Sequence, residues 1–271
     1  MPLDFFLRKG DNLLLIINNY LNQFIMKKTI FLILALVVTT LSFSQRNPNG
    51  TYLSSFVYEA KDGMRDKFES AAAKKTNMFN SEEGNLIWTY RVMTGQNAGQ
   101  YVRFLINQSS SDYGEDKSKE LAYWEKNVSP YARQISGMQN WVLIEPMNIG
   151  DDAPAAKYLE RQIFTIRPGM QDAVWRYLWR AGKTLEKVYP DGALRRVFRL
   201  ISGGNPNVVA SFRAFNDYPH WGNGDIEFED AYNEEFGWRQ HEADLKAFNE
   251  SIREWGENVI TLQRVDNMMP N

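Results

Sequence analysis

The chain has 271 residues, of which 14% are aromatic and 24% charged, a composition typical of a folded globular protein rather than a disordered one. Its formal net charge of −2 argues against a general nucleic-acid binder and against a protein held to anionic lipid by charge. Cysteine is absent and only two histidines occur, which excludes disulfides, thiolate metal sites and a cysteine nucleophile. A His-rich metal centre is therefore not expected, and we predict no metal ligands.

The N-terminal residues carry the pattern of a secretory signal peptide. Two lysines precede an uncharged apolar run at 29–41, and small residues stand at the −3 and −1 positions of a cleavage site after Ser44. A membrane span needs about 20 apolar residues, and this run is shorter. We therefore predict that residues 26–44 are cleaved off, which leaves a periplasmic or secreted protein without a stable membrane span. An uncleaved anchor is the alternative. Residues 1–25 precede a complete signal, and we interpret them as a start codon assigned too early.

The remaining chain contains an internal duplication. Gly63-Met64 recurs as Gly169-Met170 at a spacing of 106, and further on the spacing becomes 108. The matches at this second spacing include Arg91 with Arg199 and Phe104 with Phe212. Residues that match in order with one small gap predict two repeats, at 45–148 and 157–271. The segment 149–156, which contains Gly, Asp and Pro, is predicted to link them.

Both repeats predict the same order of elements. In the first we expect a strand at 52–60, a helix at 64–79, strands at 86–94 and 100–107, a helix at 116–135 and a strand at 140–146. In the second we expect a strand at 158–166, a helix at 170–188, strands at 194–202 and 207–215, a helix at 226–254 and a strand at 258–265. The acidic run at 225–230 lacks the spacing of a calcium loop and is interpreted as the start of the last helix.

The order β-α-β-β-α-β is the ferredoxin-like unit, whose antiparallel sheet has helices on one face and a bare second face. Two fused units can cover each other's bare faces. The predicted fold class is therefore α+β, with two tandem ferredoxin-like βαββαβ repeats packed sheet to sheet as an α/β-barrel. On this topology and duplication the chain resembles the dimeric α/β-barrel superfamily, with both protomers in one chain.

The resemblance implies a fold and leaves the function open. The superfamily includes antibiotic-biosynthesis monooxygenase-like proteins, haem-degrading enzymes, chlorite dismutase-like haem proteins and stress-induced barrel proteins. Their ligands usually lie between the sheet and its helices or inside the barrel.

The two histidines are candidate site residues, because haem members of the superfamily use a histidine as axial ligand. His220 lies in a loop after the third strand of the second repeat, and His241 lies inside the helix predicted at 226–254. Neither has a counterpart in the first repeat, which suggests a role specific to the second. The alternative is that both are surface histidines.

Arg91 and Arg199 are candidates because they occupy equivalent positions in the second strand of each repeat. Facing a cavity, each guanidinium could hold a carboxylate or phosphate in two parallel hydrogen bonds. Structural ion pairs at the barrel rim are the alternative, which the duplication favours. Most of the eight tryptophans are expected in the core. Trp221 is the exception, because it lies beside His220 in a loop.

These observations predict an exported protein that binds a small organic or planar hydrophobic ligand in an aromatic-lined barrel pocket, closed by the His220–Trp221 loop, without a cofactor. A haem-binding protein or haem-dependent enzyme, with His220 or His241 on the iron, is the first alternative. A non-enzymatic structural or interaction module is the second, and a barrel interior filled by side chains would favour it. The sequence names no reaction and no catalytic residue. We expect a monomer or homodimer, because one chain already supplies both halves.

Overall fold

The first repeat follows the predicted order of elements in the computed structural model. Its elements are β1 (Tyr52–Ala60), α2 (Arg65–Phe79), β2 (Leu86–Val92), β3 (Tyr101–Gln108), η1 (Asp112–Gly114), α3 (Ser118–Asn127), η2 (Ser129–Tyr131), β4 (Ala132–Gln134), β5 (Gln139–Leu143) and η3 (Glu145–Met147). Helix α3 ends at Asn127 rather than near residue 135, because Pro130 cannot continue an α-helix and the chain then turns into β4.

The second repeat has the same order with one additional break. Its elements are β6 (Tyr158–Thr165), α4 (Gln171–Val188), β7 (Leu194–Ser202), β8 (Val208–Phe215), α5 (Asp225–Phe236), α6 (Gln240–Ser251), β9 (Val259–Arg264) and η4 (Asp266–Met268). The single helix predicted at 226–254 is two helices. The main chain adopts positive φ at Gly237 and Arg239, which a right-handed helix cannot accommodate.

The structure describes residues 50–82, 85–150, 155–189, 194–216, 225–253 and 259–270, all within the unit Pro48–Asn271. The predicted signal peptide, the segment 1–25, His220 and Trp221 lie outside these residues. None of the described helices is both long and apolar enough to span a membrane.

The strands close into an antiparallel barrel. Around the barrel the order is β1, β3, β2, β9, β6, β8, β7 and β5, and β5 pairs with β1 again. Each repeat contributes one ferredoxin-like sheet, and the sheets join edge to edge where β2 meets β9 and where β5 meets β7. The short β4 pairs with the other end of β1. The predicted fold class is confirmed, and the seams between the repeats consist of backbone hydrogen bonds as well as packed faces.

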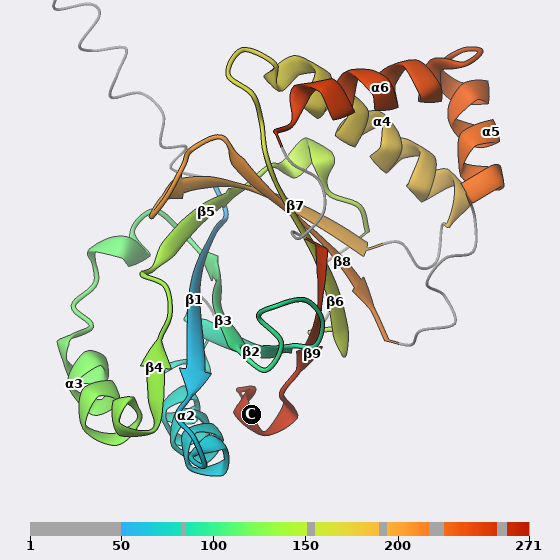
Figure 1. Cartoon of the computed structure of the whole chain (residues 1–271). Coiled ribbons are helices and arrows are strands. Elements are labelled where there is room, and N and C mark those ends of the chain that lie inside the picture. Colours follow the sequence, from blue (N-terminus) through green and yellow to red (C-terminus); the bar gives the residue numbers. More distant parts are fainter. Residues whose placement is uncertain are drawn as a thin grey trace, which may run out of the picture. The chain divides into compact units, whose positions relative to one another are not determined.

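The helices cover the outside of the barrel in two separate groups (Figure 1). Helices α2 and α3 lie on the first repeat, and α4, α5 and α6 lie together on the second. Beneath α2 and α3 the buried core includes Tyr58, Phe68 and Tyr101. Beneath α4 and α6 it includes Phe164, Val197 and Phe248.

A third core fills the barrel interior. Its buried members come from both repeats: Leu53, Tyr90, Val92, Val102, Phe104, Ile106, Trp141, Leu200, Ala210, Phe212, Ile260 and Leu262. The rings of Phe104 and Phe212, which both belong to it, meet edge to face. Strands of this barrel are therefore buried on both faces, one against the interior and one against helices.

Candidate functional site

Arg91 and Arg199 lie on the outer face of the barrel. Their strand neighbours Tyr90 and Leu200 belong to the interior core, and successive side chains of a strand point to opposite faces. Arg199 is exposed, and Arg91 approaches the Sδ atom of Met93 through Nη2 at 3.9 Å. An arginine that holds an anion in a barrel pocket must point into the barrel, and neither of these two residues does.

His241 lies at the start of α6 in an aromatic environment. Its ring centroid lies 5.2 Å from that of Tyr232, 5.5 Å from that of Phe228 and 6.2 Å from that of Tyr177. Its Nδ1 atom lies 4.0 Å from a carboxylate oxygen of Glu229, and its side chain is 15% exposed.

The surroundings of His241 do not fit an axial haem ligand. Iron coordination requires open space beside a ring nitrogen for a large macrocycle, and three aromatic rings pack against this imidazole. His220, the other predicted ligand, lies outside the described residues with Trp221. Within the described part of the chain, no three His, Asp or Glu side chains gather into a group that could hold a metal ion.

Asp244 joins the three helices of the second repeat. Its carboxylate accepts hydrogen bonds from Arg180 at 2.6 Å, from the Tyr232 hydroxyl at 2.8 Å and from Arg176 at 3.0 Å. Burial alone would raise the pKa of Asp244, but the bonds from Arg180 and Tyr232 and the charge of Arg180 outweigh it and hold this pKa below its usual range. The group is fully partnered, which indicates a structural clamp.

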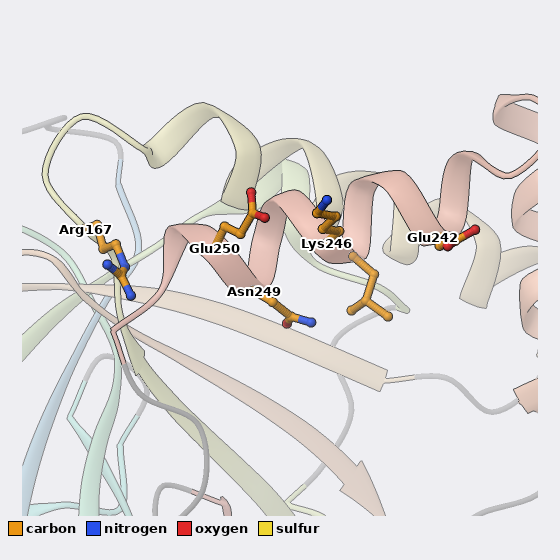
Figure 2. A pocket seen from close by; sticks show the side chains of 6 residues that line it. Arg167, Glu242, Lys246, Asn249 and Glu250 are labelled. Carbon is orange, nitrogen blue, oxygen red and sulfur yellow. The ribbon is translucent and has the colours of Figure 1, made fainter.

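A shallow groove of about 550 Å³ lies along α6, with Arg167 at one end (Figure 2). Its lining consists of Arg167, Glu242, Leu245, Lys246, Asn249 and Glu250. Most of these side chains are exposed, and acidic and basic groups alternate along the helix. The groove neither encloses a ligand nor favours one sign of charge.

A cluster with more distinctive chemistry lies between the sheet and the helices of the first repeat. We call it the basic cluster and define it as Tyr58, Lys75, Arg103, Glu120 and Trp124. Arg103 points from β3 toward α2, because its neighbours in the strand point into the barrel. It is among the largest fully buried side chains of the structure.

The two cations of the basic cluster have different partners. Arg103 donates from Nε to the Thr89 hydroxyl at 3.2 Å and from Nη2 to the Thr76 hydroxyl at 2.5 Å. Lys75 donates from Nζ to Asn80 Oδ1 at 2.5 Å and to the carboxylate of Glu120. Of the two buried cations, Lys75 is thus paired with a carboxylate, whereas Arg103 donates to two neutral hydroxyl groups.

Aromatic rings form one wall of the basic cluster. The guanidinium carbon of Arg103 lies 5.2 Å, and the Nζ of Lys75 5.9 Å, from the ring centroid of Trp124. The ring of Tyr58 lies 4.8 Å from Trp124. Cations over an aromatic face are attracted by its negative potential, which offsets part of the cost of their burial.

The burial of the basic cluster shifts the pKa values of its members. Burial lowers the pKa of Lys75 to about 8, with the charge of Arg103 adding to the effect and Glu120 opposing it. Burial also lowers the pKa of Arg103 to about 10 and raises that of Tyr58 to about 12. Several displaced pKa values in one buried cluster are typical of functional sites.

The second repeat shows that the fold does not require this cluster. At the repeat spacings, Lys75 corresponds to Ala181, Thr76 to Gly182, Thr89 to Val197, Arg103 to Ser211 and Tyr58 to Phe164. The second repeat places its own buried Arg195 beside Gly182, but that guanidinium donates to the carbonyls of Met147 and Leu178. The same layer is therefore built with main-chain partners in one repeat and with a charged cluster in the other.

Comparison with solved structures agrees with this architecture. A candidate chlorite dismutase matches with a TM-score of 0.50 and 11% identity, over 81% of this chain and 97% of that chain. A candidate monooxygenase from Lactobacillus acidophilus matches with a TM-score of 0.51 and 12% identity, over 79% of this chain and 93% of that chain. A mutant chlorite dismutase from Candidatus Nitrospira defluvii, in complex with cyanide, matches with a TM-score of 0.51 and 10% identity, over 80% of this chain and 92% of that chain. The chain has the dimeric α/β-barrel fold. Identities this low establish the fold alone, and no family model and no curated protein matches the sequence.

The residues of the basic cluster were not among the candidates found from the sequence. The sequence candidates Arg91 and Arg199 occupy a position that the two repeats share, whereas Lys75 and Arg103 occupy positions at which the repeats differ. The differences between the two repeats contain a signal for the cluster. Lys75 and Arg103 of the first repeat correspond to the uncharged Ala181 and Ser211 of the second.

Proposed function

We propose that this protein binds a small organic acid in the basic cluster of the first repeat. The observation that carries the proposal is a buried ammonium and a buried guanidinium with one carboxylate, in a layer where the second repeat buries the single guanidinium of Arg195 against main-chain carbonyls. Burying an unpaired charge costs several kcal/mol, so an arrangement the fold does not need is expected to serve a ligand.

The chemistry of the cluster defines the ligand. Arg103 and Lys75 suit a carboxylate, since a guanidinium and an ammonium both form charge-assisted hydrogen bonds with it. The rings of Trp124 and Tyr58 suit a planar apolar body. This keeps the ligand class expected from the sequence and moves its site from the barrel interior, most of which a core of side chains occupies, to the layer between sheet and helices.

Glu120 is the group that such a ligand would replace. It belongs to α3, a helix of ten residues with no buried member, and it bonds directly to Lys75. Trp124 belongs to the same helix. A ligand carboxylate against Lys75 and Arg103 would reproduce the charge of Glu120, and the weakly buried α3 could move aside to admit it. The site acts by non-covalent binding, without a cofactor.

The experiment is isothermal titration of the protein from Gln45 onward with benzoate, together with Arg103→Met, Glu120→Gln and the control Arg133→Met. Arg133 is an exposed arginine paired with Glu59 on another strand. We expect Arg103→Met to weaken binding at least about tenfold, Glu120→Gln to strengthen it because the competing carboxylate is gone, and Arg133→Met to leave it unchanged. Equal affinity in Arg103→Met and the unmodified chain, or no binding by Glu120→Gln, would refute the proposal.

A haem function is the second candidate, and the fold shared with a chlorite dismutase supports it. It depends on His220, because the environment of His241 does not fit an iron ligand. Haemin titration followed by absorption tests it. A saturable Soret shift that His220→Ala abolishes and His241→Ala preserves would favour this function over organic-acid binding.

We also propose that the protein is exported and begins at Gln45 after cleavage behind Ser44. The basic start, the apolar run at 29–41 and the small residues before the cleavage site support this. Mass spectrometry of the protein recovered from the periplasm and the medium measures its N-terminus directly. A chain that still begins at Met26 or earlier would show that the segment is retained.

A further inference from the structure

One arginine of the second repeat faces the barrel interior. Arg161 lies between Leu159 and Ile163 on β6, and both of these side chains pack against the interior core. Across the sheet it pairs with Phe212 on β8 and Ile260 on β9, two buried members of that core. Directly paired residues of neighbouring strands project to the same side of the sheet. Arg161 therefore projects into an interior built mainly of apolar groups.

The guanidinium of Arg161 has no polar partner among the described residues. Its Nε atom is buried and makes no hydrogen bond. The two Nη atoms are not among the buried unpaired atoms, and the residue as a whole retains partial solvent exposure, so this end reaches accessible space. Burial lowers the pKa of Arg161 to about 10, and no charged neighbour contributes to the shift. A buried donor without a partner is rare in folded proteins and costs stability.

The first repeat again shows that the fold does not need this charge. At the spacing of 106 the equivalent of Arg161 is Ser55, which pairs with Phe104 just as Arg161 pairs with Phe212. Ser55 accepts a hydrogen bond of 3.0 Å from the indole of Trp141 and is fully accommodated. One side of the interior is thus neutral and satisfied, and the other carries a cation with unused donors.

The surroundings of Arg161 select the kind of anion. A guanidinium is planar and weakly hydrated, and it matches a carboxylate in two parallel hydrogen bonds. Its neighbours Phe212 and Ile260 offer apolar contacts and no polar group to solvate a second charge. Strongly hydrated divalent anions would lose their water without compensation, whereas a monocarboxylate with an apolar chain would place each part against a suitable surface.

We propose that Arg161 forms a second binding site inside the barrel, for an aliphatic monocarboxylate whose carboxylate reaches the Nη atoms and whose chain packs against Phe212 and Ile260. The site is separate from the basic cluster, which lies on the outer face of the first repeat sheet. It also departs from a purely structural barrel, in which the two sheet faces would only bury each other.

Thermal unfolding with sodium butyrate, against sodium sulfate and sodium chloride at equal ionic strength, tests the proposal. The variants are Arg161→Met, which keeps an unbranched apolar side chain without the guanidinium, and Arg161→Lys, which keeps the charge without the bidentate geometry. Arg213→Met is the matched control, because Arg213 is a partly exposed arginine on the outer face of β8, paired with Glu160 at 3.5 Å. Arg103→Met reports on the other site.

We expect butyrate to raise the midpoint of thermal unfolding of the unmodified chain, of Arg213→Met and of Arg103→Met. The apparent affinity for butyrate should fall at least tenfold in Arg161→Met and by a smaller factor in Arg161→Lys. An equal effect of butyrate on Arg161→Met and Arg213→Met overturns the proposal. A sulfate effect that Arg161→Met reduces as much as it reduces the butyrate effect also overturns it, since the general stabilisation by sulfate does not depend on this residue. Should Arg161→Met not fold, an undiminished response of Arg161→Lys overturns it as well. Loss of the butyrate effect in Arg103→Met alone would instead assign the binding to the basic cluster.

Discussion

Phe104 and Phe212 occupy equivalent positions in the two repeats, and their rings meet in the barrel interior with centroids 5.5 Å apart at an interplanar angle of 90°. Each is almost completely buried and comes from the third strand of its own repeat. This edge-to-face contact is one of the places where the two halves of the duplication meet, so it contributes both buried area and orientation to the closure of the barrel.

Truncation of either ring should destabilise the whole barrel. We expect Phe104→Ala and Phe212→Ala each to lower the free energy of unfolding by about 3–5 kcal/mol, through lost burial and the cavity left behind. Because the rings touch, the double variant should lose less than the sum of the single losses. Urea unfolding measures all three, with the exposed Met138→Ala as control. A loss below about 1 kcal/mol in either single variant would show that the halves do not depend on this contact.

Gly95 and Gly203 follow the second strand of each repeat, and the structure predicts different costs for their replacement. Both have positive φ, 81° and 86°, so alanine is strained at each by about 1–2 kcal/mol. A Cβ at Gly95 would meet only the Cγ2 atom of Ile260 at 3.4 Å, whereas one at Gly203 would lie 2.3 Å from the main-chain oxygen of Met138. We expect Gly203→Ala to cost about 1–3 kcal/mol more than Gly95→Ala in urea unfolding. Equal costs would mean that the chain near Met138 moves aside freely.

Asp244 should make the second repeat sensitive to acid. Its pKa is held below the usual range in the folded protein, so its contribution to stability is present above the unfolded value, near 4, and is lost as the pH falls through the folded value. Asp244→Asn should cost about 3 kcal/mol at pH 7, because Arg176 and Arg180 lose their partner. The unmodified chain should therefore lose more stability between pH 6 and pH 3 than Asp244→Asn. The exposed Asp66→Asn, by comparison, should follow the unmodified chain, and parallel curves for all three would contradict the assignment.

Lys75 should also make stability rise with pH, but at alkaline rather than acidic pH. Its pKa is about 8 in the folded protein against 10.5 in an unfolded chain, so between these values the unfolded state binds more protons and stability rises with pH. The stability of the unmodified chain relative to Lys75→Met should therefore increase by roughly 2 kcal/mol from pH 8 to pH 10. Denaturant unfolding at the two pH values measures this difference. The exposed Lys67→Met should show no such change, and a flat difference for Lys75→Met would mean that Lys75 has an ordinary pKa.

The architecture of this protein could be predicted from its amino-acid sequence. Matches such as Gly63 with Gly169 and Phe104 with Phe212 revealed the duplication, and local periodicity located nearly every strand and helix. These features depend on neighbouring residues and on a repeat spacing, both of which are visible in one dimension. The breaks after α3 and between α5 and α6 were missed, because a short interruption alters the periodicity of an amphipathic segment very little.

The burial and the direction of the charged side chains, by contrast, became visible once the strands were placed in space. The strands of this barrel are apolar on both faces, so alternation around Arg91, Arg103 and Arg161 cannot tell the interior from the helix-covered side. The partners of these arginines come from distant parts of the chain, as Thr76 does for Arg103. Burial and pairing are set by such long-range contacts. For this reason Arg91 and Arg199, which recur in both repeats, lie on the outer face of the barrel, while Arg103, which is buried, and Arg161, whose Nε atom is buried, lack a carboxylate partner among the described residues.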